Sequence, residues 1–246
     1  AAPTAKKKRF RALRVIIKTL LWTVGVVVVL LLLAFAFLQT APGKNFVKGI
    51  VLGVLNDTFR GRIELDELDG FLPFDAELVG FRAYDPEGKL VINVERLTAD
   101  FEPLGLFDST VHLSNVQVTN PTVELFDEQN RVALLRAFEL RTPSTDDTPS
   151  PWIVRFEGVH LAGGRIDSVA PGEDLALTEL ELDLSLGLAP DGLRWPKVEL
   201  RAKPVGSSEL VAMLVDGGSD EMNGMIVVRT SGGLSNGKLM LDTFEV

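Results

Sequence analysis

Two residue types that build many functional sites are scarce here: the 246 residues include no cysteine and only two histidines. Without cysteine the chain forms neither disulfides nor cysteine-ligated metal centres, and an oxidising compartment would not alter it. His112 and His160 lie 48 residues apart and have no carboxylates at metal-ligand spacing. We therefore expect ordinary strand histidines and no metal site.

Catalytic motifs are also missing. No serine lies in a nucleophile-elbow pattern. Residues 232–237, GGLSNG, lack the Lys-Ser/Thr ending of a phosphate loop, and residues 215–224, VDGGSDEMNG, lack the alternating carboxylates and final glutamate of a calcium loop. We expect neither an enzyme nor a bound cofactor.

Positive charge is confined to the start of the chain. Residues 1–18 hold seven basic groups and no acid, a charge of +7, whereas the rest holds 18 basic and 34 acidic groups, a charge of −16. Nucleic-acid binding needs clustered Lys and Arg to contact phosphates, so an acidic body excludes nucleic acid as a partner.

One long apolar run is present. Residues 19–38, TLLWTVGVVVVLLLLAFAFL, carry no charge and as a helix would measure about 30 Å, the thickness of a bilayer core. A cleaved signal peptide is the alternative, since residues 34–36 are Ala-Phe-Ala, but the run exceeds the usual length of a signal-peptide core. We therefore expect a retained membrane anchor, represented along its length by Thr19, Trp22, Val28, Leu32, Phe37 and Leu38.

The basic cluster sets the expected orientation of this anchor. Residues 1–18 form a basic segment whose topology signal is Lys6, Lys7, Lys8, Arg9, Arg11 and Arg14. Basic residues favour the cytoplasmic side, which places residues 39–246 across the membrane. Residues 39–56 then form a linker and, after Pro42-Gly43, a short amphipathic helix that either lies on the membrane surface or plugs one end of the structure that follows.

From residue 57 onward the pattern indicates strands and turns. YDPEG at residues 84–88 has the Asp, Pro and Gly positions of a type I turn and joins strands 75–83 and 89–101 as a hairpin. Further strands are expected at residues 110–118, 122–126, 152–161, 165–169, 175–188, 197–202, 209–215, 225–230 and 238–246, with a helical turn at 134–140. Such spacing favours a largely antiparallel meander in two segments, 57–140 and 152–246, separated by a polar loop at 141–151.

The apolar alternation of these strands slips repeatedly. Gaps of three separate apolar residues at 65–68, 78–81, 94–97, 113–116, 177–180 and 241–244, and a bulge at each gap would keep one face apolar while bending the strand. A spacing of apolar residues also recurs from 116–123 to 159–166 and 198–205, which we interpret as a repeated strand, tight reversal and strand. A curved sheet with one apolar face must close on itself, receive a second sheet, or hold something apolar.

Several motifs resemble the TamB family, the inner-membrane subunits of the translocation and assembly module, within the AsmA-like group. They are Gly70 with apolar neighbours, Val79-Gly80-Phe81 before the turn, EPLGLF at 102–107, and NVQV at 115–118 leading to PTVEL at 121–125. The resemblance implies an inner-membrane anchor, a periplasmic body folded as an open, taco-like β-groove, phospholipid transport, and support of outer-membrane protein assembly with a TamA-like barrel of the Omp85 family. About thirteen strands at roughly 4.8 Å span only about 60 Å, so we expect the N-terminal part of a longer protein whose missing C-terminal region binds the barrel.

Three functions remain open: a lipid conduit, an anchored scaffold that offers strand edges to outer-membrane proteins, and a structural subunit with a closed β-sandwich. A conduit would bind acyl chains through apolar residues on its inner face. The predicted groove lining is Ile63, Leu65, Leu78, Phe81, Ile92, Val94, Leu97, Phe101, Val111, Leu113, Val116, Val118, Val123 and Leu125.

Overall fold

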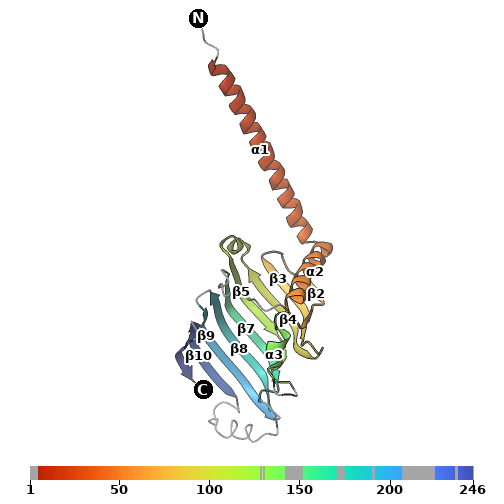
Figure 1. Ribbon diagram of the computed structural model, residues 1–246, viewed down its shortest axis with the longest axis vertical. Helices are drawn as coiled ribbons and strands as arrows, with labels where there is room; N and C mark the ends of the chain where they lie inside the picture. The colour runs from red at the N-terminus through yellow and green to blue at the C-terminus, as the bar shows by residue number, and fades with distance from the viewer. Residues whose placement is uncertain are drawn as a thin grey trace. The chain divides into compact units, whose positions relative to one another are not determined.

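The computed structural model describes residues 5–127, 129, 131–141, 152–170, 175–189, 192–206, 225–235 and 238–245. The chain forms two compact units, Ala1–Lys44 and Asn45–Val246. The first is helical and the second is mainly β (Figure 1).

Helix α1, Ala5–Leu38, contains the predicted anchor. Its stretch Ile17–Leu38 has a mean hydropathy of 2.8, and its apolar side chains are exposed, so by length and composition it can span a bilayer. The predicted anchor residues all lie on this stretch. The basic side chains of the topology signal, from Lys6 to Arg14, lie outside the described side chains.

Helix α2, Ala41–Thr58, begins slightly earlier than predicted. The break between the helices falls at Gln39 and Thr40, and Thr40 accepts a hydrogen bond of 3.2 Å from the backbone N–H of Gly43 as an N-cap. Pro42 lies inside the first turn because a proline needs no N–H partner there. The predicted start after Pro42-Gly43 was therefore wrong.

The described strands form one curved, mixed, 11-stranded sheet in the order β1-β3-β4-β5-β7-β8-β9-β10-β11, with β2 paired to β3, and β6 paired to β4 and β7 (Figure 1). The predicted hairpin is confirmed, since β3 and β4 pair across the turn at Asp85. The predicted strand at 209–215 lies outside the described residues. The strand bounds are β1 Arg62–Glu64, β2 Glu67–Asp69, β3 Asp75–Tyr84, β4 Leu90–Phe101, β5 Thr110–Thr119, β6 Thr122–Glu124, β7 Ile153–Asp167, β8 Leu175–Ala189, β9 Gly192–Gly206, β10 Ile226–Ser235 and β11 Lys238–Glu245.

A parallel junction at the centre of the sheet corrects the expected meander. Strands β5 and β6 both pair in parallel with β7, at a constant offset of 43 residues, as in Thr110 with Ile153 and Thr122 with Arg165. Ile153, the first residue of β7, pairs with Thr110, the first residue of β5, so the two strands run in the same direction. The repeat spacing between 116–123 and 159–166 is the register of this pairing, and the tight reversals that we inferred from it were wrong.

Bulges curve the sheet at several predicted slips. Register shifts fall at the gaps 113–116, 177–180 and 241–244, where an extra residue keeps the apolar side chains on one face. The gaps 78–81 and 94–97 lie opposite each other in the pairing of β3 with β4. The apolar alternation is therefore interrupted at the same place in both strands, and the register between them does not shift there. Strand β7 has two further bulges, with Gly158 and Gly163 at positive φ. It runs without a break from Ile153 to Asp167, so the two separate strands predicted at 152–161 and 165–169 are one strand.

Well-buried packing is concentrated at one end of the sheet. Helix α3, Ala133–Ala137, lies over the start of β4, where Val91, Ala133 and Ala137 are each at most 2% exposed. Neighbouring Ile63 and Ala83 are also buried. This end, here called the α3 end, therefore has a small protein core. The opposite end, where β4 ends and β5 begins, is called the η1 end after the 3-10 helix η1, Pro103–Asp108.

Candidate functional site: the apolar face of the sheet

The strand register places twelve of the fourteen predicted lining residues on strands of the first half of the sheet. Directly opposed residues share a face, and the pairs are apolar throughout. They are Phe81 with Val94, Leu78 with Leu97, Leu97 with Val118, Phe101 with Leu113, Ile92 with Val123, Ile63 with Ala83, and Val111 with Val154. Val116 lies in the bulge of β5 and has no directly opposed partner on β4. Leu65 and Leu125 lie just outside the strands.

The same apolar face continues across β7 to β11, beyond the predicted lining. Leu182 opposes Leu161 on β7 and Leu200 on β9, and Val198 opposes Thr230 on β10, which opposes Phe244 on β11. The period-two alternation of β8, LALTELELDLSLGLA, carried this signal in sequence. The bulges, which preserve the facing, are what allow residues so far apart along the chain to line one surface.

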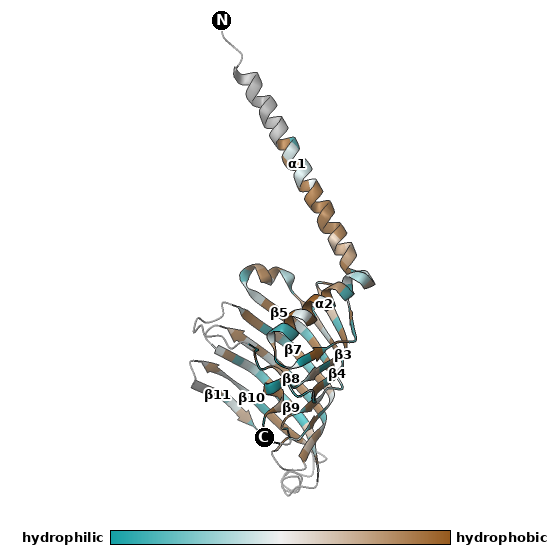
Figure 2. Ribbon diagram, turned by 45° about the vertical axis from the view of Figure 1, so that its right-hand side comes forward, coloured by the Kyte–Doolittle hydropathy of each residue, from teal (hydrophilic) through white to brown (hydrophobic). Residues whose placement is uncertain are grey.

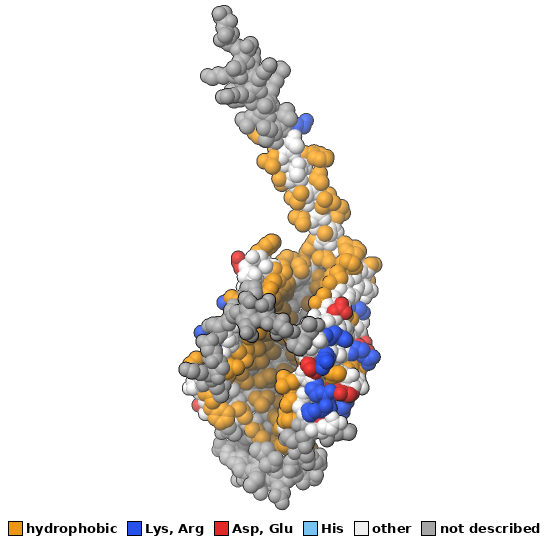
Figure 3. Space-filling view, in the orientation of Figure 1, with side chains coloured by type: hydrophobic (Ala, Val, Ile, Leu, Met, Phe, Trp, Pro, Cys, Tyr) orange, Lys and Arg blue, Asp and Glu red, His pale blue; other side chains and the backbone are white. Residues whose placement is uncertain are grey.

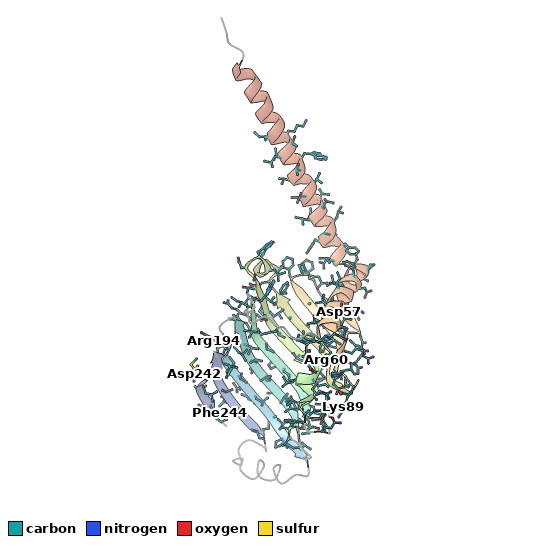
Figure 4. All side chains as sticks on the ribbon, viewed as in Figure 1. Asp57, Arg60, Lys89, Arg194, Asp242 and Phe244 are labelled. Carbon is teal, nitrogen blue, oxygen red and sulfur yellow. The ribbon has the colours of Figure 1, made fainter. Side chains whose placement is uncertain are left out.

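A hollow of about 440 Å³ lies on this second half. It is lined by Leu184, Leu186, Trp195, Val198, Thr230, Leu241 and Phe244. Figure 3 shows the hollowed face crowded with apolar side chains, and Figure 4 labels Phe244 on the last strand. Six of these seven residues are apolar, so the hollow suits hydrocarbon far better than a polar ligand.

Exposure along the apolar face rises from the α3 end towards the η1 end of β8. Leu180 is 3% exposed and packs over Gly164 of β7, where an added Cβ would lie 3.1 Å from the leucine Cβ. Leu188, on the same strand and face, is 47% exposed. The face is therefore more exposed towards the η1 end, and the described residues place no second sheet over it.

The other face of β8 to β10 is charged. Glu199 accepts hydrogen bonds from Arg201 (2.8 Å) and Arg229 (3.4 Å), and His160 Nδ1 lies 3.0 Å from Asp183 Oδ1. The Arg201 guanidinium, and then Arg229, hold the pKa of Glu199 below its usual value. Figure 2 shows the resulting mixture of apolar and polar positions along each strand. The sheet is thus amphipathic, with its charged face suited to water.

An ion-pair network fastens α3 to the β3–β4 turn. Arg136 bonds to Glu87 and lies 3.2 Å from Asp127 and 3.5 Å from Asp85, two carboxylates that are less than 10% exposed. Burial acts to raise the pKa of Asp127, but hydrogen bonds from Arg131 and the backbone N–H of Gln129 outweigh it and lower the pKa to about 2. Every charge here has a partner, so the network is structural.

The two histidines lie on the charged face. His112 Nδ1 is 3.1 Å from Glu102 Oε2, and its Nε2 is 3.4 Å from Glu157 Oε2. Within the described ranges, no three His, Asp or Glu side chains are grouped as a metal site would require.

Helix α2 borders the β1 edge of the sheet. The Asn56 amide exchanges two hydrogen bonds with the backbone of Ile63 (2.7 and 2.9 Å), and Lys48 Nζ donates to the Asp66 carbonyl (3.0 Å). Phe46, Ile50 and Val54 form a stripe that is at least half exposed. Both expected roles of this helix, at a membrane surface or as a plug, remain predictions.

No protein-family model matches the chain, and no curated protein matches it.

Proposed function

We propose that this chain is a membrane-anchored β-groove protein that carries phospholipid acyl chains along the apolar face of its sheet. In this proposal α1 is a single-pass inner-membrane anchor, the sheet lies in the periplasm, and the chain acts without enzymatic activity. On the strength of its resemblance to the TamB and AsmA-like proteins, we further propose that the chain carries lipid between the inner and outer membranes. A TamA-like barrel would be the partner of a further C-terminal region.

The observation that carries the proposal is the apolar face, over which the described residues place no second sheet, with its hollow of about 440 Å³. A sheet face of this composition in water is unfavourable by roughly 25 cal/mol per Å² of apolar surface, so it requires an apolar cover. Among the described residues, most of the buried apolar side chains lie at the α3 end, around Val91, Ala133 and Ala137. Acyl chains are a suitable cover because apolar burial is non-directional and the face offers almost no polar group to select a head group.

Neighbouring residues of β9 allow a matched test. Val198 lines the hollow, whereas Lys197 points to the charged face and is 60% exposed. A photo-crosslinking amino acid placed at residue 198 of the full chain, in membranes, should form phospholipid adducts that mass spectrometry detects, and the same amino acid at 197 should not. Because both variants carry the same α1, lipid around the anchor contributes equally. Equal adduct formation at the two positions, or none at either, would contradict the proposal.

A second candidate, a scaffold for outer-membrane proteins, is favoured by the strand order. Strands β1 and β11 end the order, and Asn56 of α2 bonds to both the N–H and the carbonyl of Ile63 in β1. Among the described residues, the β11 edge is therefore the one offered to a further strand by β-augmentation. Proline in place of Met240, a β11 residue that does not line the hollow, should weaken such pairing while leaving lipid adducts at residue 198 intact. Pull-down of unfolded outer-membrane protein by the two forms separates the scaffold from the conduit.

A further inference from the structure

The η1 end of the sheet carries a row of exposed apolar side chains, here called the apolar rim. Leu104 is 75% and Phe107 87% exposed on η1, and Leu106 is 45% exposed beside them. Phe71, Phe74 and Trp152 are each at least 43% exposed. Large side chains gathered in this way mark a surface that meets another apolar phase.

Backbone contacts bring these residues to one end although they come from three parts of the chain. The N–H of Phe101, at the end of β4, donates to the Phe74 carbonyl (2.6 Å), and the Phe74 ring stacks on Phe71. The N–H of Ile153, next to Trp152, donates to the carbonyl of Ser109, which follows η1 (2.9 Å). The rim therefore spans the ends of β3, β4, β5 and β7, which Figure 1 shows side by side.

The chain enters the β unit at this same end. Lys48, near the start of α2, contacts Asp66, and the N–H of Asp66 donates to the carbonyl of Val79 in β3. Asn56, near the end of α2, contacts Ile63, which pairs with Ala83 further along β3. The N-terminal part of α2 thus lies towards the start of β3, where the rim is. Asn45 follows the last residue of the apolar helix, Leu38, by seven residues, a reach of at most about 25 Å.

We propose that the apolar rim inserts into the outer leaflet surface of the bilayer that α1 spans, so that the open end of the apolar face meets lipid directly. This inference rests on the proposed membrane anchor. The occupant is a bilayer because, among the described residues, the stretch long and apolar enough to span one is Ile17–Leu38, which is tethered to this end of the unit. Side chains such as Phe107 would reach about 5–10 Å into the headgroup and acyl boundary, and Trp152 is of the type enriched there.

Charge near the rim specifies which lipid surface fits. Glu102 precedes η1 and Asp108 is its last residue, and both are exposed. Their carboxylates would repel an anionic surface, so insertion depends on the apolar side chains and is strongest into zwitterionic lipid. The leaflet outside the cytoplasm is the one with which residues beyond α1 would make contact.

The absence of cysteine makes a site-specific test simple. Full-length Phe107→Cys and Leu104→Cys, each labelled with the fluorophore NBD, are reconstituted in phosphatidylcholine nanodiscs that contain a shallow doxyl-lipid quencher. The matched control is Leu135→Cys on α3, which is also apolar and 69% exposed but lies about 33 Å away along β4. Quenching at 107 and 104 with little at 135 is the expected result, and Phe107→Asp should remove most of the quenching at 104.

Two results would overturn the inference. Quenching at 107 that is no greater than at 135 would show that the rim lies in water. Blue-shifted emission at 107 without quenching would show that a protein covers the rim. Neither result depends on crosslinking at Val198. Lipid adducts at Val198 without rim insertion would support the proposed function and refute this inference. Rim insertion without adducts would support the membrane contact and refute the proposed function.

Discussion

Two leucines on one face of β8 provide a test of whether the apolar face is open. Leu180, at 3% exposure, is held by fixed protein neighbours, so Leu180→Ala leaves a cavity and should lower the free energy of unfolding by about 3 kcal/mol. Leu188, at 47% exposure, has about half of its side chain in contact with protein. Leu188→Ala should cost only about 1 kcal/mol, because half of a transfer term of about 2 kcal/mol is lost and water or a mobile acyl chain fills the space.

The assay is urea unfolding of the full chain in detergent micelles, followed by circular dichroism of the strands and by the fluorescence of the three tryptophans, of which Trp195 lines the hollow. Midpoints are compared at unchanged slope, so that the difference reports stability alone. The two substitutions remove the same atoms from the same strand, which cancels differences in helix or strand propensity. If Leu188→Ala costs as much as Leu180→Ala, a fixed protein layer covers both, and the closed sandwich replaces the groove.

Two further predictions concern the acid-sensitive network and the bulges. The pKa of Asp127 is lowered to about 2, so its contribution to the free energy of unfolding is fully present above the unfolded pKa near 3.8 and is lost as the pH falls through 2. Asp127→Asn should therefore flatten the pH dependence of thermal unfolding between pH 4 and 2. An unchanged slope would refute this. Gly163 has φ of +69° and an added Cβ would lie 2.4 Å from Asn120 Oδ1, so Gly163→Ala should cost about 1–2 kcal/mol in urea unfolding, whereas Gly187→Ala, in open space, should be near neutral.

Local patterns predicted the local structure well. The Asp, Pro and Gly of residues 84–88 act within one turn, and the hairpin between β3 and β4 formed as expected. Apolar gaps located the bulges at 113–116, 177–180 and 241–244, because a bulge is the local means of keeping a side chain on its face. The N-cap of α2 at Thr40 was not predicted, because Pro42, two residues later, suggested a break in the chain.

Long-range pairing was harder to predict. The offset of 43 residues between the two apolar patterns contained the register of β5 and β6 with β7, but spacing alone does not distinguish parallel neighbours from successive hairpins. The predicted lining ended at residue 125 although β8 alternates as clearly as β4. The difference between Leu180 and Leu188 has no sequence signal, because both residues occupy the same alternating pattern and only tertiary packing separates them.

The two ends of the sheet differ in how far their apolar side chains are buried. Here the charged network of Arg136 fastens α3 over one end, while the exposed side chains of η1 stand at the other. The chain enters the β unit from α2 at the η1 end, and under the proposed function an apolar molecule would enter or leave the described part of the face there. Blocking that end, with Leu188→Asp for example, should reduce lipid adducts at Val198 without altering the packed residues around Leu180.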